Sequence, residues 1–372
     1  MRAQVVFWIS WVAVFYTYAG YPLALLVLRL FVRRPVHRAQ ILPSVSFLIP
    51  AYNESRVIER KIRNSLALDY PAERLEVVVA SDGSTDDTVA IAKRLADGRR
   101  VRVAAYPCNR GKMATLNASV PHLSGDIIVF SDASALLYPD ALRRLVRSFA
   151  DPDVGAVSGR YTVVQAGEVN TGASEDLYWK YETSLKELES DLASTLGAHG
   201  HLYAIRRELY PYPAPATIND DYVIFVSVLA KGYRAVYDAT AIVYEEAREM
   251  AGFQRRVRIV AGNIQQLREI GPLIHPLRPL PLFFFVSHKL ARLLVPLLLL
   301  AALTANVFLL PRPFYRAILC AQALFYLLAC WGSLWRLRPK ILMLPFYFSM
   351  INAATFFGFY HALTRRRNMA WE

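Results

Sequence analysis

The fold is decided by residues 45–84, which read VSFLIPAYNESRVIERKIRNSLALDYPAERLEVVVASDGS. The stretch opens with an apolar run (VSFLIP), continues with apolar residues at helical spacing (ESRVIERKIRNSLAL) and closes with a second apolar run that ends in a polar turn (LEVVVASDGS). Short apolar runs bounded by turn residues predict buried strands, and the segment between them predicts an amphipathic helix. This order predicts a βαβ unit with parallel strands.

The same alternation continues to residue 134. DDTVAIAKRLAD and KMATLNASVPHL predict two more helices, and VRVAAY (101–106) and DIIVFSDAS (126–134) predict two more strands. Repeated βα units predict an α/β fold with a parallel sheet, and ligands of such sheets bind beyond the carboxyl ends of the strands. Three of the predicted strands end in polar clusters, which read PAYNE, SDGSTDD and SDAS. The sequence therefore predicts a site at this edge of the sheet.

The composition indicates a membrane protein with a soluble middle. The chain has 372 residues, of which 55% are hydrophobic, and its mean hydropathy is +0.25. The apolar residues crowd positions 5–32 and 281–363, whereas most acidic residues lie between them. A soluble domain of about 240 residues is large enough to bury its own core. The cysteines show no paired or metal-ligand spacing, so no disulfide framework is expected: Cys108, Cys320 and Cys330.

Four apolar segments are candidates for crossing a bilayer. The first, Val5 to Leu28, carries no charge and is long enough to span, and it lacks the small-residue cleavage site of a signal peptide. The C-terminal candidates cover residues 287–310, 314–335 and 341–363, each of which has a buried core helix as its alternative. Before them, a basic amphipathic stretch and a Pro-rich stretch are candidates for the membrane surface.

The basic residues predict the orientation. The net charge is +13, and many cationic residues flank the apolar segments: Arg33, Arg34, Arg38, Arg336, Arg338, Lys340, Arg365, Arg366 and Arg367. This placement favours cytoplasmic membrane boundaries over a nucleic-acid groove, so we expect no nucleic-acid partner. We expect a multi-pass protein of the inner membrane with the middle domain in the cytoplasm. Three C-terminal spans would, however, place TRRR outside. The sequence leaves open whether the last segment is re-entrant or interfacial, or whether the charge tendency fails here.

We accordingly divide the chain into four parts. Residues 1–43 form a transmembrane helix and basic linker, and residues 44–249 form the α/β domain. Residues 250–290 are expected to be interfacial, and residues 291–372 to hold the C-terminal transmembrane segments.

Seven motifs occur in order along the middle of the chain: PAYNE (50–54), SDGSTDDT (81–88), NRGKMATLN (109–117), SDAS (131–134), GAHGHLYAIRREL (197–209), NDD (219–221) and RRVRI (255–259). Each alone is weak, but together they resemble membrane-bound glycosyltransferase family 2, the cellulose, chitin and hyaluronan synthase-like group. The resemblance runs from about residue 44 to 265, and the flanking apolar helices suit it. It implies a GT-A fold and an inverting mechanism with Mg²⁺ or Mn²⁺.

By this resemblance, Ala51, Tyr52 and Glu54 line a nucleoside pocket and Asp82 contacts the uracil or ribose. An Asp at a strand end accepts readily from a base N–H or a ribose hydroxyl, although SDGST is also a good turn sequence on its own. Lys112 is expected to contact the donor, with a solvated lysine as its alternative.

SDAS corresponds to the family's D-x-D metal motif, with Asp132 as the implied ligand and Ser134 in place of the second Asp. Asp132 provides the hard oxygen that Mg²⁺ and Mn²⁺ prefer, whereas a serine hydroxyl supplies less charge. We therefore expect weaker metal affinity, or a metal that the donor phosphates hold for the most part.

In NDD, Asp221 stands at the family's catalytic base and Asp220 at its acidic neighbour. Adjacent carboxylates raise one another's pKa and make a better base, while two acids capping a helix are the alternative. Arg255 and Arg258 fall on an arginine motif that would bind the departing diphosphate, with a lipid-facing basic stripe as the alternative.

Two positions on the acceptor side depart from the family. Ile259 replaces a Trp that helps polymerising relatives hold the acceptor, so processivity is in doubt. His199 stands where many relatives carry Asn or Asp, and it is either an acceptor contact or a packed histidine.

The resemblance implies transfer from a UDP-sugar to a growing glycan or lipid-linked acceptor, for a cell-surface polysaccharide or exopolysaccharide. One alternative is single addition to a lipid acceptor, which the few spans and the missing Trp favour. Another is an inactive membrane scaffold or partner subunit, which Ser134 and Ile259 favour. The expected partners are the donor, the acceptor and the bilayer. About four spans make a narrow pore at most, unless further protomers of a homo-oligomer or an export partner contribute.

Overall fold

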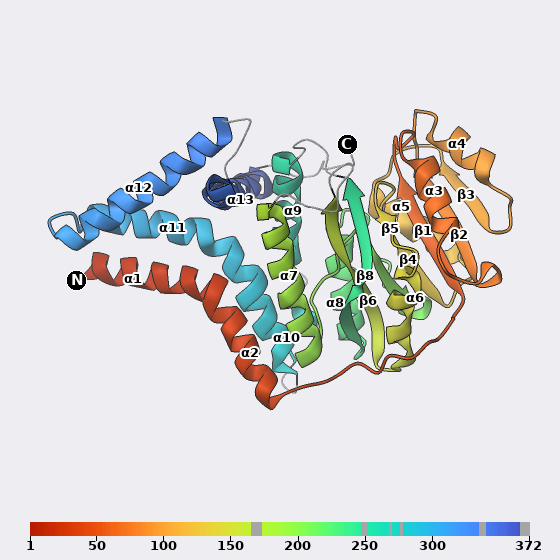
Figure 1. Ribbon diagram of the computed structural model, residues 1–372, viewed down its shortest axis with the longest axis horizontal. Helices are drawn as coiled ribbons and strands as arrows, with labels where there is room; N and C mark the ends of the chain where they lie inside the picture. The colour runs from red at the N-terminus through yellow and green to blue at the C-terminus, as the bar shows by residue number, and fades with distance from the viewer. Residues whose placement is uncertain (165–172, 247–251, 268–269, 276–277, 335–339, 365–372) are drawn as a thin grey trace.

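The computed structural model describes residues 1–164, 173–246, 252–267, 270–275, 278–334 and 340–364. An α/β domain lies at one end of the molecule, and long apolar helices extend away from it at the other (Figure 1). Helices α7 (Ala173–Leu192), α9 (Gly252–Gln266) and α13 (Lys340–Thr364) lie between these two parts.

A single eight-stranded sheet forms the centre of the domain in the described residues, in the order β3-β2-β1-β4-β7-β6-β8-β5. Its strands are β1 Val45–Ala51, β2 Leu75–Asp82, β3 Val101–Tyr106, β4 Ile127–Phe130, β5 Leu136–Leu137, β6 Val154–Val164, β7 Tyr203–Arg206 and β8 Arg234–Glu246. The strands β3, β2, β1 and β4 pair in parallel, which confirms the predicted βαβ units.

The other half of the sheet is mixed, so the expectation of a parallel sheet holds for only half of it. Strand β7 pairs antiparallel with both β4 and β6, and β5 pairs antiparallel with β8. Among the described strands of this half, only β6 and β8 pair in parallel. The strand β7 has four residues, too few for a periodic pattern to identify it as a strand. Its antiparallel pairing could therefore not be predicted.

Both faces of the sheet are covered. Alternate residues of β1 enter different cores, with Phe47 and Ile49 on one face and Leu48 on the other. Strands buried on both faces read as continuous apolar runs, which is the pattern of residues 47–51. The domain's helices are α3 Ile58–Leu66, α4 Thr88–Leu95, α5 Lys112–Ser119, α6 Ala141–Val146, α7 Ala173–Leu192, α8 Asp220–Ala230 and α9 Gly252–Gln266.

Three helical stretches are long and apolar enough to cross a membrane among the residues that the structure describes: Arg2–Phe31, Pro279–Val307 and Pro313–Gly332. The first combines α1 (Arg2–Phe15), a π-helical turn and α2 (Tyr21–Phe31). The second combines α10 (Pro279–Phe284), the π-helical segment η8 (Phe285–Leu290) and α11 (Ala291–Val307), and so runs through residue 290 without a break. The third lies within α12 (Pro313–Leu334).

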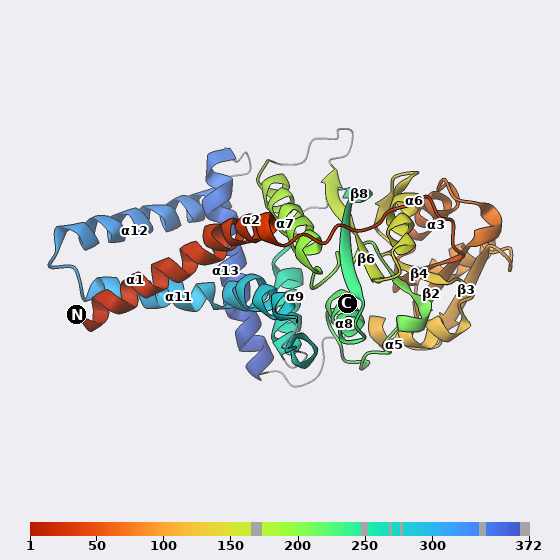
Figure 2. The same ribbon diagram turned by 90° about the horizontal axis from the view of Figure 1, so that it is seen from below.

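The last apolar segment takes a different direction. Helix α13 (Lys340–Thr364) runs across α11 and α12 and alongside α9 (Figure 2). Gly358 of α13 makes the approach to α9 close, because a Cβ there would lie 2.4 Å from the Val260 side chain. The rings of Phe253 and Phe357, 5.7 Å apart, add to the same contact. The basic residues 365–367 lie outside the described part of the chain.

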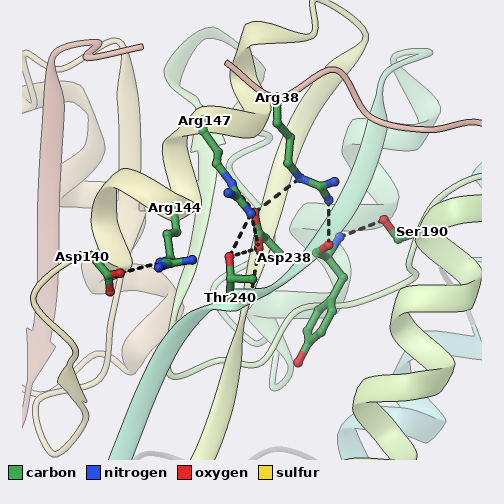
Figure 3. A network of polar contacts seen from close by, with 8 residues as sticks. Arg38, Asp140, Arg144, Arg147, Ser190, Asp238 and Thr240 are labelled. Carbon is green, nitrogen blue, oxygen red and sulfur yellow. Dashed lines mark hydrogen bonds and ion pairs between the residues drawn. The ribbon is translucent and has the colours of Figure 1, made fainter. Parts of the chain in front are cut away.

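The linker between α2 and β1 is fastened to the domain. The carboxylate of Asp238, 2% exposed, pairs with Arg147 at 3.0 Å and with Arg38 of the linker at 3.4 Å. Figure 3 shows both guanidinium groups converging on this carboxylate, with Thr240 beside it. Arg38 therefore contacts the α/β domain, and through Asp238 it connects the linker after α2 to β8.

Candidate functional site

A cavity of about 320 Å³ opens at the carboxyl edge of the parallel strands. Seven of the predicted site residues line it: Tyr52, Glu54, Lys112, Asp132, Ser134, Asp220 and Arg258. They come from the loop after β1, from α5, from the loop after β4, and from α8 and α9, and the outermost of them, Tyr52 and Arg258, are 206 positions apart in the chain. The strand ends thus meet as the alternation of strands and helices predicted.

Lys112 joins two of the predicted acids. Its Nζ lies 3.1 Å from Asp132 Oδ1 and 3.3 Å from Asp220 Oδ1, and its side chain is 16% exposed. Burial lowers the pKa of Lys112, but the charges of Asp132 and Asp220 outweigh it and raise the pKa above the usual value for lysine. The solvated-lysine alternative is therefore wrong.

Glu245 supplies a carboxylate beside Ser134. The Ser134 hydroxyl donates to Glu245 Oε1, and the Tyr161 hydroxyl donates to Glu245 Oε2 at 2.9 Å. Glu245 also lines the cavity together with Asp132. Sequence reasoning missed this residue, because nothing near VYEE at the end of β8 points to a position 111 residues earlier.

Asp220 and Asp221 begin helix α8 and lie in different surroundings. Asp220 is buried, with one oxygen paired to Lys112 and the other accepting from the Tyr203 hydroxyl at 2.6 Å. Asp221 is half-buried and does not line the cavity. Burial, followed by the charge of Asp220, raises the pKa of Asp221 to about 6. Asp220 therefore does more than cap the helix, and Asp221 is the acid whose pKa suits a base.

Asp82 is buried and positions the loop before α5. Its two oxygens accept from the backbone N–H of Arg110 at 2.9 Å and of Gly111 at 2.8 Å. Gly83, in the same turn, has a φ of +69°, and a Cβ there would lie 2.4 Å from Asn109 N. The turn interpretation of SDGST thus fits, while direct contact of Asp82 with a nucleoside stays a prediction.

The PAYNE loop is tied to the SDGSTDDT loop. Asn53, with a φ of +53°, accepts at Oδ1 from Thr85 N at 2.8 Å, and Glu54 N donates to Thr88 Oγ1 at 2.8 Å. Ala51 is fully buried as the last residue of β1. The two loops are therefore joined, and Tyr52 and Glu54 of the first loop line the cavity.

Helix α9 packs against the NDD motif. Gly262 permits this, because a Cβ there would meet Asn219 Oδ1 at 2.5 Å. Asn219 Nδ2 donates to Asn263 Oδ1 at 3.1 Å and to Ile259 O at 3.3 Å. The contact brings Arg258 to the cavity. The Ile259 side chain is 41% exposed, and the side chain of Arg255 lies outside the described ones.

His199 is buried and does not line this cavity. Its ring lies 5.4 Å from the Trp179 ring and 5.7 Å from that of Tyr237. Burial lowers its pKa well below the usual value. The packed-histidine interpretation thus describes its surroundings, and an acceptor contact stays a prediction.

Comparison with known proteins agrees with this arrangement. The family model described as glycosyl transferase family 2 matches residues 46–211. A poly-beta-1,6-N-acetyl-D-glucosamine synthase of Staphylococcus aureus is 24% identical over 242 residues, which are 63% of this chain and 58% of that protein. An N-acetylglucosaminyltransferase of Rhizobium leguminosarum bv. viciae is 26% identical over 231 residues, 58% of this chain and 54% of that protein. The chain thus spans less than two thirds of the length of these relatives.

A solved structure is similar over nearly the whole chain. It is a mannosyltransferase from Pyrobaculum calidifontis in complex with GDP-Man and Mn²⁺, with a TM-score of 0.76 and 24% identity. The similarity covers 97% of this chain and 100% of that one, and it confirms the GT-A-like fold with apolar helices at both ends. The motifs, the sheet and the family model agree on the same part of the chain: residues 46–211 match glycosyl transferase family 2.

Proposed function

We propose that the protein is an inverting membrane glycosyltransferase, which moves a sugar from a UDP-sugar to a glycan acceptor in cell-surface or exopolysaccharide synthesis. The observation that carries the proposal is the cavity, which combines oxygen ligands at Asp132, Ser134 and Glu245 with cations at Lys112 and Arg258. A nucleoside diphosphate needs this combination of a metal site and fixed positive charge.

The oxygen ligands in the cavity suit a hard divalent cation. Asp132 and Glu245 provide carboxylates and Ser134 provides a hydroxyl, which are the oxygen ligands that Mg²⁺ and Mn²⁺ prefer. Bound there, the cation would neutralise charge on the leaving diphosphate. Lys112 and Arg258 provide further positive charge on the cavity wall. Lys112 also holds Asp132 and Asp220 in place.

Asp221 is the base in this proposal. With a pKa of about 6, its carboxylate is mostly ionised at neutral pH and yet basic enough to take a proton from an acceptor hydroxyl. Asp220 supports it in two ways, by its charge and by anchoring the start of α8 to Tyr203 and Lys112.

The three membrane-length helices suit a domain on the cytoplasmic side of the inner membrane. With α1–α2, α10–α11 and α12 as spans, the chain after α12 returns to the side of the α/β domain. Helix α13 would then lie along the membrane surface beside α9, and the basic C-terminal sequence would stay inside. This topology would agree with the basic charges if the last segment is interfacial. Three spans make a narrow pore at most, so export of a polymer would require further protomers or a partner.

The test is a donor panel with purified protein. UDP-sugars and GDP-Man would be supplied with Mg²⁺ or Mn²⁺, with release of nucleoside diphosphate and then product mass as readouts. We expect one UDP-sugar to support turnover, and preferred turnover of GDP-Man would replace the UDP assignment. Absence of metal-dependent binding of UDP and of GDP by calorimetry would favour the scaffold alternative.

Single addition to a lipid acceptor is the second candidate. It is favoured by Ile259, which places no aromatic ring at the position where polymerising relatives hold the acceptor. Product length on gels with labelled donor separates a ladder of polymers from a single product.

A further inference from the structure

A fully buried lysine lies behind the wall of the donor cavity. Lys61, in α3, is 0% exposed, and it is not among the residues that line the cavity. Burying an amino group costs free energy unless hydrogen bonds and nearby charges compensate for the lost water. The contacts of Lys61 therefore indicate why a lysine stands at this position.

Lys61 contacts both ends of the loop that follows β4 and runs from Ser131 to Ala135. Its Nζ donates to Ser131 Oγ at 2.6 Å and also to the carbonyl oxygen of Ala135. Between these ends, Asp132 and Ser134 line the cavity. One nitrogen atom thus fixes both ends of a short segment that carries two of the proposed metal ligands.

These hydrogen bonds do not depend on the charge of Lys61. Burial lowers the pKa of Lys61 to about 7, while the charges of Asp132 and Glu245 oppose that shift. An ammonium group has three N–H donors, and a neutral amine keeps two of them. Two donors are enough for the hydroxyl and the carbonyl that Lys61 contacts, so the loop is held in either state.

Ser131 extends the contact to the other side of the cavity. Its hydroxyl accepts from Lys61 and donates to His201 O at 2.7 Å. The His201 ring stacks on the ring of Tyr161, with centroids 4.0 Å apart, and its Nε2 lies 3.5 Å from Glu245 Oε2. The network that begins at Lys61 thus reaches Glu245, the third proposed metal ligand.

A second side chain of α3 makes a different contact. Asn64 lies three positions after Lys61, on the same face of the helix. Its Nδ2 donates to Leu137 O and its Oδ1 accepts from Leu137 N, both at 2.9 Å. Leu137 belongs to β5 and does not line the cavity. Asn64 therefore fastens α3 to the sheet, whereas Lys61 fastens it to the loop that carries Asp132.

We propose that Lys61 is a positioning residue of the metal site, which holds Asp132 and Ser134 at the spacing that a divalent cation requires. Mg²⁺ demands ligands at about 2.0–2.1 Å in nearly ideal octahedral geometry, so a small displacement of the loop weakens its binding. Position matters more with Ser134 in the motif, because a hydroxyl must touch the cation to contribute, whereas a second carboxylate would also attract it from a distance.

This inference rests on the proposed function and adds a residue to its metal site. The sign of the effect separates positioning from charge. Removal of a positive charge near the site would by itself strengthen the binding of a cation. Loss of the two hydrogen bonds to the loop would weaken it. Lys61→Met distinguishes the two effects, because methionine is also long and unbranched but donates no hydrogen bond.

The test measures Mn²⁺ binding to the full chain in detergent with UDP present, from the electron paramagnetic resonance signal of free Mn²⁺. Lys61→Met should weaken the apparent Mn²⁺ affinity by about ten-fold or more, as is typical of residues that hold metal ligands in place. The affinity for UDP without metal should stay within a few-fold, since Lys61 does not line the cavity.

Asn64→Leu is the matched control. It removes two hydrogen bonds of the same helix, so it should lower the temperature of thermal unfolding. Its Mn²⁺ affinity should equal that of the unmodified protein. Unchanged or stronger Mn²⁺ binding in Lys61→Met would overturn the role of Lys61, and so would an equal loss of affinity in Asn64→Leu.

Should Lys61→Met fail to fold, Ser131→Ala decides, because it removes the hydroxyl between Lys61 and His201 and leaves the Ala135 contact. We expect it to weaken Mn²⁺ binding by at least about three-fold, and unchanged binding would overturn the proposal. If the unmodified protein binds no Mn²⁺ with UDP, the proposed function is rejected and this inference with it. If it binds Mn²⁺ and Lys61→Met binds equally well, only the role of Lys61 is rejected.

Discussion

The hydroxyl of Ser134 donates a hydrogen bond to the carboxylate of Glu245, across 111 positions of the sequence. The pair joins the loop after β4 to the end of strand β8, and both residues line the cavity. Glu245 thereby places a carboxylate beside Ser134, the position at which the SDAS motif has a hydroxyl in place of the family's second Asp.

Glu245→Gln should weaken the apparent affinity for Mn²⁺ by about ten-fold or more, because an amide supplies no charge to a hard cation. The measurement is the Mn²⁺ dependence of nucleoside diphosphate release. Glu246→Gln is the matched control, since the neighbouring Glu246 pairs with Arg60 on the surface instead of lining the cavity. Adding Ser134→Asp to Glu245→Gln should restore metal affinity. Failure to do so would contradict the proposal that Glu245 supplies the carboxylate that SDAS lacks.

Asp221→Asn should lower turnover by about a hundred-fold or more, because general base catalysis contributes that much and an amide cannot take the proton. The affinity for UDP with Mn²⁺, measured by calorimetry, should stay within a few-fold, since Asp221 does not line the donor cavity. Near-normal turnover in this variant would remove the assignment of the base.

Turnover should depend on pH through the same residue. The base must be ionised, so the rate should fall about ten-fold per unit as the pH drops below the Asp221 pKa of about 6, and level off above it. The readout is the pH profile at saturating donor. A level profile down to pH 5 would show that another group limits the rate.

A stability effect with a definite sign accompanies that raised pKa. Because the folded protein holds the Asp221 proton more tightly than the unfolded chain does, ionisation at neutral pH costs folding free energy. Asp221→Asn should therefore unfold at a higher temperature than the unmodified protein at pH 7.5. The difference should vanish at acidic pH, where both forms are neutral, and thermal unfolding at both pH values checks it.

Asp238→Ala should destabilise the domain by about 3 kcal/mol, because it leaves Arg147 and Arg38 without their buried partner. Asp153→Ala is the control, since Asp153 pairs with Arg34 at 3.8 Å on the surface and should cost less than about 1 kcal/mol. Denaturant unfolding in detergent measures both. Equal losses in the two variants would show that the Asp238 cluster contributes no more than a surface pair.

The half of the fold with local signals was predictable. Strands such as Val45–Ala51 are continuous apolar runs separated by helices of ordinary length, so their type and parallel pairing follow from the chain order. The mixed half was not predictable, because β7 is short and its neighbours β4 and β6 are fixed by pairings across the chain. The direction of α13 was equally hidden, since its apolar composition suits a span and a surface helix alike.

The site shows the same division. Tyr52, Asp132 and Asp220 follow or precede regular elements that have clear motifs, and they meet in one cavity as predicted. The sequence did not identify Glu245 and Tyr203 as site residues, because their roles arise from contacts with residues in other motifs. Asp82 shows the opposite case: the motif is real, but both of its oxygens are used to hold the backbone of 110–111.

The fastening of the linker has a mechanical consequence. Arg38 ties the chain leaving α2 to β8, and Tyr21 ties α2 itself to Glu189 of α7. With two attachments on different helices and strands, the domain cannot swivel freely about its anchor. Asp221, which lies in helix α8 of the same domain, is thereby restrained relative to the helices Arg2–Phe31 and Pro279–Val307. The protein would then set the distance between Asp221 and the membrane. For an acceptor held in the membrane, the length of its head group, as well as its chemistry, would decide which of its atoms reaches the sugar.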